Sequence, residues 1–281
     1  MGSEDTKPVY VLGSTPAERE RVARLAARLS PLTERLFREA GIGEGHRVLD
    51  IGSGVGDVAM LVATIVGPRG EVVGVERDPQ SVHRARERAL AEGFRNVRFE
   101  ESDVDGFAGT TPFDAAVGRL ILQFLPDPLK SLRTLKRLVR PGGVLAFHEP
   151  AWPPSLAVAP HLTLWQASAT LIQETFHRSG ANTEIGLALN RLFVEAGLPS
   201  PTMRLEVPLG NSPEFAGRVY DVLRSIRPRF EEWGLYPEAL GDFDTLEQRL
   251  EEEISSSPTA VPFGVGLVAA WTRIPEGIEG A

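Results

Sequence analysis

One stretch of the sequence decides the fold, and it reads Asp50-Ile51-Gly52-Ser53-Gly54-Val55-Gly56-Asp57. It follows a short apolar run at 47–51 and precedes a longer apolar run at 58–66. Glycines between a strand and a helix let the backbone approach a ligand closely, because no side chain obstructs it. The stretch is therefore predicted to be a ligand-binding loop.

The loop belongs to a regular alternation of strand and helix signals. Strands are expected at 47–51, 72–76, 97–100, 113–118 and 144–149, and helices at 58–66, from Asp78-Pro79 to Gly93, and from Asp127-Pro128 to about Val139. A strand, a helix and a strand in this length imply a parallel pair. Because the strands are rich in Val, Ile, Leu and Phe, they are expected to be buried on both faces. Residues 45–150 are thus predicted to form an α/β core.

Helical segments flank this core on both sides. Thr15-Pro16-Ala17-Glu18 forms a capping box that opens a helix, Ser30-Pro31 is expected to start a second one, and Gly41 to end it. Residues 1–44 are interpreted as a helical lid. Beyond the core, helices are expected at 161–178, 184–196 and within 213–253, and strands at 202–208 and 262–272. Residues 151–281 are predicted to complete the same sheet and to carry two helical insertions, at about 151–181 and 211–258, that cap the substrate.

Composition excludes several classes of function. The chain has 281 residues, a net charge of −8 and no cysteine. An acidic surface argues against nucleic acid or an anionic membrane as the partner, since both require clustered Lys and Arg. Without cysteine there are no disulfides, no thiolate nucleophiles and no cysteine-based metal sites. With no apolar run of membrane-spanning length, we expect a cytoplasmic protein that acts on a small molecule, as a monomer or a homodimer.

Three acidic side chains indicate which ligand the loop binds. A dinucleotide fingerprint has Gly or Ala at the position of Asp57, and a carboxylate there would repel a pyrophosphate at the helix N-terminus. Asp50, at the end of the first strand, instead suits an ammonium group. Glu76, at the end of the second strand, suits the two hydroxyls of a ribose, although NAD enzymes use the same device. A ligand with an ammonium, a ribose and no phosphate is S-adenosylmethionine.

Four blocks in order make the resemblance specific. They are Val48-Leu49-Asp50-Ile51-Gly52-Ser53-Gly54-Val55-Gly56, Val73-Gly74-Val75-Glu76, Phe113-Asp114-Ala115-Ala116-Val117-Gly118-Arg119 and Leu138-Val139-Arg140-Pro141-Gly142-Gly143. From about residue 45 to 150 the sequence resembles the class I S-adenosylmethionine-dependent methyltransferases, in the branch of the ubiquinone and menaquinone C-methyltransferases and of many natural-product methyltransferases. The resemblance implies a doubly wound, mostly parallel, seven-stranded Rossmann-like sheet with N-terminal helices and helical lid insertions.

The resemblance also assigns cofactor-binding residues. It implies that Asp50, Gly52 and Gly54 line the methionine moiety together with Ser53, and that Glu76, next to Arg77, holds the ribose. It further implies that Asp103 and Val104 frame the adenine, that Arg119 contributes its backbone near the methionine amino group, and that Tyr10 is a lid residue that contacts the cofactor. Simple structural roles remain the alternatives, above all for Asp103, which lies in an acidic loop, and for Tyr10.

Candidate catalytic residues lie where the strands end. In an open parallel sheet the reaction occurs beyond the carboxyl ends of the strands, and His148 and Glu149 end the fifth predicted strand. Either is a candidate general base, and the two should point to opposite faces. A second candidate is Glu174 with His177, which lie about one helical turn apart. The spacing of the histidines does not favour a metal site, so no metal is predicted.

The acceptor is predicted to be small and apolar or planar. The expected insertions supply aromatic residues that could close over such an acceptor, among them Trp152, Trp165, Phe176, Phe215, Tyr220, Trp233 and Tyr236. Methylation on carbon or oxygen, in natural-product biosynthesis, is the expected reaction. Two alternatives stay open: an NAD(P)-dependent oxidoreductase on the same fold, and a non-catalytic protein that binds S-adenosylmethionine. The apolar segment 261–271 is interpreted as a buried strand, with a dimer contact as the alternative.

Overall fold

A computed structural model describes residues 16–109, 111–212 and 214–276. Within them the chain divides into two compact units. Of the described residues, one unit comprises those within 25–149, 187–204 and 268–276, and the other those within 16–24, 150–186 and 205–267. The first holds almost all of the sheet and is called the sheet unit below; the second is called the helical unit.

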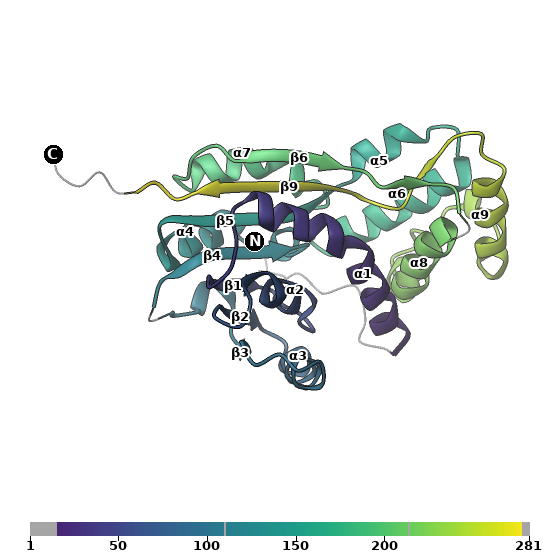
Figure 1. The fold of residues 1–281 in the computed structure, drawn as a ribbon. Helices are drawn as coiled ribbons and strands as arrows, with labels where there is room; N and C mark the ends of the chain where they lie inside the picture. The colour runs from purple at the N-terminus through teal and green to yellow at the C-terminus, as the bar shows by residue number, and fades with distance from the viewer. Residues whose placement is uncertain (1–15, 110, 213, 277–281) are drawn as a thin grey trace, which may run out of the picture. The chain divides into compact units, whose positions relative to one another are not determined.

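The sheet unit is built around seven strands, labelled in Figure 1, in the order β3-β2-β1-β4-β5-β9-β6. The strands are β1 (Arg47–Ile51), β2 (Glu71–Glu76), β3 (Val97–Glu101), β4 (Phe113–Arg119), β5 (Val139–Ala151), β6 (Thr202–Glu206) and β9 (Gly266–Arg273). Strands β1 to β5 pair in parallel. This is the mostly parallel, seven-stranded doubly wound sheet that the sequence predicts. The chain crosses from β3 to β4 past the central β1, so the ends of β1 and β4 meet where the strand order reverses.

Helices form where apolar periodicity and caps predict them. They are α1 (Pro16–Glu39), α2 (Asp57–Val66), α3 (Pro79–Ala91), α4 (Pro128–Leu138) and α7 (Ile185–Glu195), with the 3₁₀ turns η1 (Val104–Gly106) and η2 (Leu122–Phe124). Asp78 and Asp127 cap α3 and α4 by accepting backbone hydrogen bonds at the first turn. The core of this unit joins the buried faces of α1 and α2 to the strands, with Leu36, Phe37, Val62, Val72 and Val117 among its members.

Two boundaries in the sheet unit differ from the sequence prediction. Instead of two helices at the N-terminus there is one, α1, which passes through Pro31. Pro31 and Ala27 are both exposed, so the carbonyl that loses its partner can be hydrated, while the buried Leu29 and Leu36 hold the helix together. Strand β5 begins five residues before Val144. The turn 141–143 counts as strand because Gly142 and Gly143 exchange backbone hydrogen bonds with Ile274.

The predicted last strand is divided in two. A short β8 (Val261–Pro262) pairs antiparallel with β7 (Leu209–Gly210), and β9 follows. Strand β9 lies between β5 and β6, so the segment predicted to be buried is an internal strand of the sheet, and its residues from Gly266 to Ala270 are buried.

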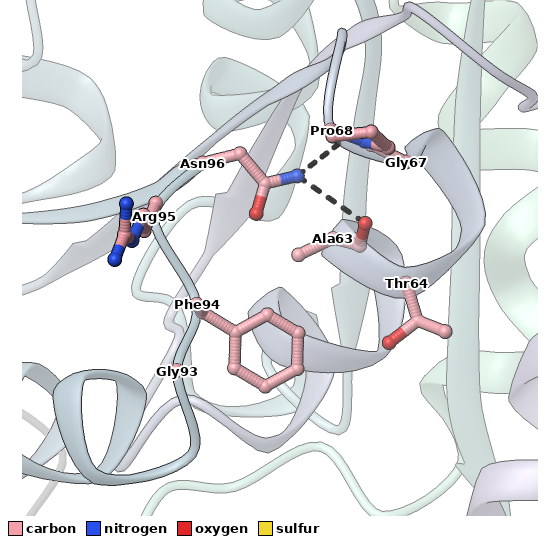
Figure 2. Close-up of a pocket in the computed structure, with 8 residues that line it drawn as sticks. All are labelled: Ala63, Thr64, Gly67, Pro68, Gly93, Phe94, Arg95 and Asn96. Atoms are coloured by element: carbon pink, nitrogen blue, oxygen red, sulfur yellow. Dashed lines mark hydrogen bonds between the residues drawn. The ribbon is translucent and has the colours of Figure 1, made fainter.

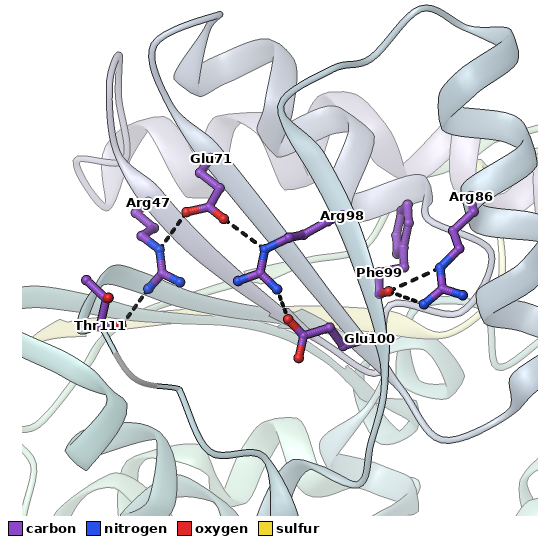
Figure 3. A network of polar contacts seen from close by, with 7 residues as sticks. All are labelled: Arg47, Glu71, Arg86, Arg98, Phe99, Glu100 and Thr111. Atoms are coloured by element: carbon purple, nitrogen blue, oxygen red, sulfur yellow. Dashed lines mark hydrogen bonds and ion pairs between the residues drawn. The ribbon is translucent and has the colours of Figure 1, made fainter.

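A ladder of charged side chains crosses the neighbouring strands β1, β2 and β3 (Figure 3). Glu71 accepts hydrogen bonds from Arg47 at 2.6 Å and from Arg98 at 2.9 Å, and Arg98 also pairs with Glu100. Partial burial alone would raise the pKa of Glu71, but the two guanidinium hydrogen bonds lower it. These contacts between oppositely charged side chains stabilise the pairing of the three strands, so we interpret the ladder as a structural feature of the sheet.

The helical unit has its own apolar core. It contains α5 (Trp152–Val158), α6 (Thr163–Arg178), α8 (Glu214–Glu232) and α9 (Leu246–Ser255), and its core includes Trp165, Leu223, Phe230, Phe243 and Leu250. The predicted helical segment 213–253 is therefore two helices, separated by residues 233–245. No helix in the described ranges is long and apolar enough to cross a membrane.

Candidate functional site

The glycine loop is held in a conformation that needs glycine. Gly52 and Gly54 have φ values of +60° and +52°, which side-chain-bearing residues rarely adopt. A Cβ on Gly52 would lie 2.3 Å from Cδ1 of Ile121, whereas one on Gly54 would meet no atom within 4 Å. The loop therefore packs tightly at Gly52 and leaves open space at Gly54, as the approach of a ligand requires.

Asp50 is buried at the end of β1 with an unsatisfied oxygen. The residue is 1% exposed, and Oδ2 has no hydrogen-bond partner among the described residues. Burial raises the pKa of Asp50 well above its usual value; nearby Arg119 opposes the shift and Glu76 adds to it. An unpaired buried oxygen costs about 1–3 kcal/mol, so its presence needs an explanation. A ligand ammonium that donates to Oδ2 would supply it.

Glu76 ties the end of β2 to the loop. Its Oε2 accepts a hydrogen bond from the backbone nitrogen of Gly54 at 3.1 Å, and its Oε1 accepts one from the backbone nitrogen of Asp78 at 2.9 Å. Each oxygen keeps a lone pair for a further donor. The carboxylate is thus oriented beside the open space at Gly54, in a position that suits the two hydroxyls of a ribose.

The other predicted cofactor residues lie at the same edge of the sheet. Ser53 is buried, and its Oγ has no hydrogen-bond partner within the described ranges. Arg77 and Asp103 are exposed, and Val104 is buried in η1. Tyr10 lies outside the described residues.

Arg119, at the end of β4, connects two parts of the site. It is close enough to Asp50 to moderate the pKa of that carboxyl, and burial lowers the pKa of Arg119 itself. Its Nη1 donates to Oγ1 of Thr33 in α1 at 3.3 Å. Thr33 also lies 3.2 Å from Nδ1 of His148. Sequence reasoning missed Thr33, although a hydroxyl on the helix face that carries Leu29 and Leu36 is a signal that could have found it.

Glu149 points away from His148, as their alternation on β5 predicts. It is fully buried, and its Oε1 accepts backbone hydrogen bonds from Ile121 and Leu122, both at 3.0 Å. Burial raises its pKa to about 7, against the lowering effect of the backbone hydrogen bonds. Its Oε2 has no partner in the described part of the chain. The carboxyl therefore anchors the turn that follows β4, where Leu120 adopts a φ of +56°.

Glu174 and His177 lie in the helical unit, on α6. Both are exposed, and Glu174 pairs with Arg178 at 3.6 Å. In the described ranges, no three His, Asp or Glu side chains gather in a way that could hold a metal ion.

A separate cavity of about 440 Å³ lies elsewhere in the sheet unit (Figure 2). Its lining comes from the end of α2, the turn after that helix, and the segment that precedes β3: Ala63, Thr64, Gly67, Pro68, Gly93, Phe94, Arg95 and Asn96. Asn96 crosses it, donating to the backbone oxygens of Ala63 and Gly67. These segments lie at the amino ends of β2 and β3, so the cavity is at the opposite edge of the sheet from Asp50 and Glu76.

Comparisons with known proteins found a family profile, curated relatives and solved structures that this chain is similar to. The family profile described as "Methyltransferase domain" matches residues 42–196. The ubiquinone/menaquinone biosynthesis C-methyltransferase UbiE of Coxiella burnetii is 33% identical over 119 residues, which are 41% of this chain and 48% of that protein. The aklanonic acid methyltransferase DauC of Streptomyces sp. strain C5 is 33% identical over 125 residues, 44% of this chain and 56% of that protein. The matched part is about half the length of these relatives.

Among solved structures, YcgJ from Bacillus subtilis superimposes with a TM-score of 0.58. The match covers 87% of this chain and 98% of that one, at 16% sequence identity. At this identity the match shows a shared fold and nothing more. The seven-stranded sheet is therefore one that this chain shares with a distant bacterial protein.

Proposed function

Because the chain belongs to the methyltransferase domain family, we propose that it transfers a methyl group from S-adenosylmethionine to a small organic acceptor. The family resemblance expected from the four sequence blocks is confirmed by that match. The class that these blocks resemble uses S-adenosylmethionine as its cofactor. The residues that would hold this cofactor and assist the transfer lie at the carboxyl ends of β1, β2, β4 and β5.

One observation carries the proposal: the buried Asp50 keeps an unsatisfied oxygen beside a loop that is open at Gly54. A cationic ammonium would satisfy Oδ2 and favour the ionised carboxylate, whereas the phosphates of a dinucleotide would meet the negative charges of Asp50 and Asp57. Arg88 donates to Asp57 at 2.9 Å and so holds that carboxylate at the start of α2. Glu76, already oriented by two backbone amides, would accept the ribose hydroxyls.

The bound cofactor supplies an electrophilic methyl group on a positive sulfur. The protein then has to align the acceptor, exclude water and remove a proton from the acceptor where the chemistry requires it. Asp50 would hold the methionine ammonium of the cofactor and Glu76 its ribose. The turn at 120–124, anchored by Glu149, would form part of the wall at the carboxyl end of β4.

His148 and Glu149 are the proposed candidates for the base. Both lie near the carboxyl end of β5, next to the end of β4. A pKa of about 7 gives Glu149 the proton affinity of a base at neutral pH, and its Oε2 is not engaged by any described residue. His148 is positioned by Thr33. The pair Glu174 and His177 is retained as a second proposal, although their exposure gives less support to it.

The acceptor is proposed to be apolar or planar, methylated on carbon or oxygen. Support comes from the names of the two curated relatives, one in ubiquinone/menaquinone biosynthesis and one that methylates aklanonic acid. A place in natural-product biosynthesis, in the cytoplasm, belongs to the same proposal. Most of the large aromatic side chains of the helical unit pack into its own core, so they support the acceptor class less directly.

Calorimetric titration with S-adenosylhomocysteine and with NAD tests the proposal. We expect tight binding of the former, no heat with the latter, and loss of binding in Asp50→Asn. The control is Asp114→Asn, a partly buried carboxylate near the amino end of β4 that pairs with Arg140. Binding of NAD in place of S-adenosylhomocysteine would overturn the proposal, and equal loss in both variants would show that Asp50 acts only through folding.

A further inference from the structure

Thr33 is a buried hydroxyl with three polar neighbours. Its Oγ1 lies 3.0 Å from the backbone oxygen of Leu29, 3.2 Å from Nδ1 of His148 and 3.3 Å from Nη1 of Arg119. Thr33 and His148 are both fully buried. All four residues belong to the sheet unit, and they join α1 to the ends of β4 and β5.

The chemistry of these neighbours decides where the protons lie. A carbonyl oxygen only accepts and a guanidinium only donates, while a hydroxyl has one proton to give and two lone pairs. If the hydroxyl of Thr33 donates its hydrogen bond to the backbone oxygen of Leu29, then its oxygen accepts hydrogen bonds from Arg119 and from Nδ1 of His148, and each of the three contacts holds one proton. If Thr33 instead gave its proton to His148, the 3.0 Å contact between its oxygen and that of Leu29 would hold no proton and would be repulsive.

We propose that Thr33 is a positioning residue that keeps a proton on Nδ1 of His148, so that Nε2 is the nitrogen that gains and loses a proton. The partner of one ring nitrogen sets the tautomer and thereby the role of the other nitrogen. In free histidine the opposite tautomer, with the proton on Nε2, predominates. The buried hydroxyl thus selects the form in which Nε2 is basic.

The consequence for the reaction rests on the proposed function. With Nε2 basic, an acceptor of the O–H or activated C–H class would lose its proton to Nε2. The bond from sulfur to the methyl group would break as the bond from the methyl group to the acceptor formed, which would leave a neutral thioether and an imidazolium on His148. Arg119 shares the same hydroxyl and lies within electrostatic reach of Asp50. Thr33 therefore connects the proposed base to the carboxylate proposed to hold the cofactor.

Nitrogen NMR of the full-length protein, without any ligand, tests the inference. The chain is labelled with ¹⁵N-histidine, and His148 is assigned by the signal that disappears in His148→Gln. At a pH where His148 is neutral, we expect Nδ1 to show the protonated, pyrrole-type shift and Nε2 the unprotonated, pyridine-type shift. The reverse pattern in the unmodified protein would overturn the inference without any variant.

Variants at Thr33 separate positioning from folding. Thr33→Val keeps the shape but removes the acceptor, so the pyrrole-type signal of Nδ1 should be lost or strongly reduced, whereas Thr33→Ser should restore it. Thr175→Val is the matched control, because Thr175 is also buried and bonds the carbonyl four residues before it, at 2.6 Å, but it lies in α6. An unchanged tautomer in a folded Thr33→Val would count against the inference. The expected tautomer together with no methyl transfer would overturn only the proposed function.

Discussion

The carboxylate of Glu76 lies 3.1 Å from the backbone nitrogen of Gly54 and accepts its hydrogen bond. Through this contact, the end of β2 sets the shape of the loop that follows β1. The second oxygen of Glu76 accepts from the backbone of Asp78, so the carboxylate is fixed by the chain on both sides before any ligand arrives. A side chain that is already oriented loses little conformational entropy on binding.

Replacing Glu76 with Ala should weaken binding of S-adenosylhomocysteine by about 10- to 100-fold, since hydrogen bonds to a charged group contribute about 1.5–3 kcal/mol. Calorimetry measures the loss. The control is Glu101→Ala, because Glu101 lies directly opposite Glu76 in the parallel register of β2 and β3 but is exposed. Equal losses in the two variants would assign the effect to general charge and not to the ribose contact.

Asp50→Asn should change the stability of the ligand-free protein and its ligand binding in opposite directions. Burial raises the pKa of Asp50, so the contribution of its protonated form is present at low pH and is lost as the pH rises through the folded pKa. At pH 8 the neutral amide of Asp50→Asn would remove the cost of burying an ionised carboxylate, and it would keep an acceptor for the backbone hydrogen bond from Ala59. The free energy of unfolding, measured with urea, should therefore rise by about 1 kcal/mol. The stabilisation that S-adenosylhomocysteine confers should disappear. A less stable ligand-free variant would indicate that Asp50 is structural.

The strands and helices of the sheet unit could be predicted because short, local sequence signals determine them. Caps such as Asp78 and Asp127, and apolar runs between glycines, fix where each element begins. The predicted boundaries were wrong where contacts with distant residues determine where an element begins or ends. Residues 139–143 extend β5 because Gly142 and Gly143 pair with Ile274, more than a hundred residues away. Helix α1 continues through Pro31 because its buried face outweighs the lost hydrogen bond.

The candidate site shows the same division. That Asp50 and Glu76 lie near each other could be predicted from their positions at strand ends, which the topology of a parallel sheet brings together. The contact between Thr33 and His148 could not be predicted, because 115 residues separate the two and nothing local in the sequence marks them as a pair. Nor could the sequence reveal that Glu149 holds the amides of Ile121 and Leu122, since the direction of a buried side chain depends on packing.

Glu149 should make the stability of the protein depend on pH. Its pKa is raised from the ordinary 4.5 to about 7, so its stabilising contribution is complete below pH 4.5 and is lost as the pH rises through 7. This difference converts to roughly 3 kcal/mol at most. Urea unfolding between pH 5 and pH 8 measures it. Glu149→Gln should remove this dependence and keep an acceptor for both amides. Glu149→Ala should also remove the dependence, and should be about 2–3 kcal/mol less stable than Glu149→Gln at all pH values because two buried amides become unpaired. If the unfolding free energy of the parent and of Glu149→Gln changed with pH in the same way, the pH dependence would not come from Glu149.

A side chain from another helix caps the first turn of α6. Replacing it should lower the stability of the protein without affecting ligand binding. Glu253, on α9, accepts hydrogen bonds at 2.8 Å from the backbone nitrogens of both Leu164 and Trp165. Its negative charge also lies at the positive end of the helix. Glu253→Ala should therefore cost about 1–2 kcal/mol in unfolding free energy, and Glu253→Gln less, because the amide retains one acceptor oxygen.

Glu251→Ala is the control for this cap, since Glu251 is on the same helix and is only partly buried. Denaturant unfolding followed by tryptophan fluorescence measures the stability, and calorimetry with S-adenosylhomocysteine measures the site. Binding should be unchanged in Glu253→Ala at temperatures where the protein is folded, because Asp50 and Glu76 belong to the other unit. If the variant lost binding while its unfolding free energy stayed the same, the cap would have a role in the site that hydrogen bonding to α6 does not explain.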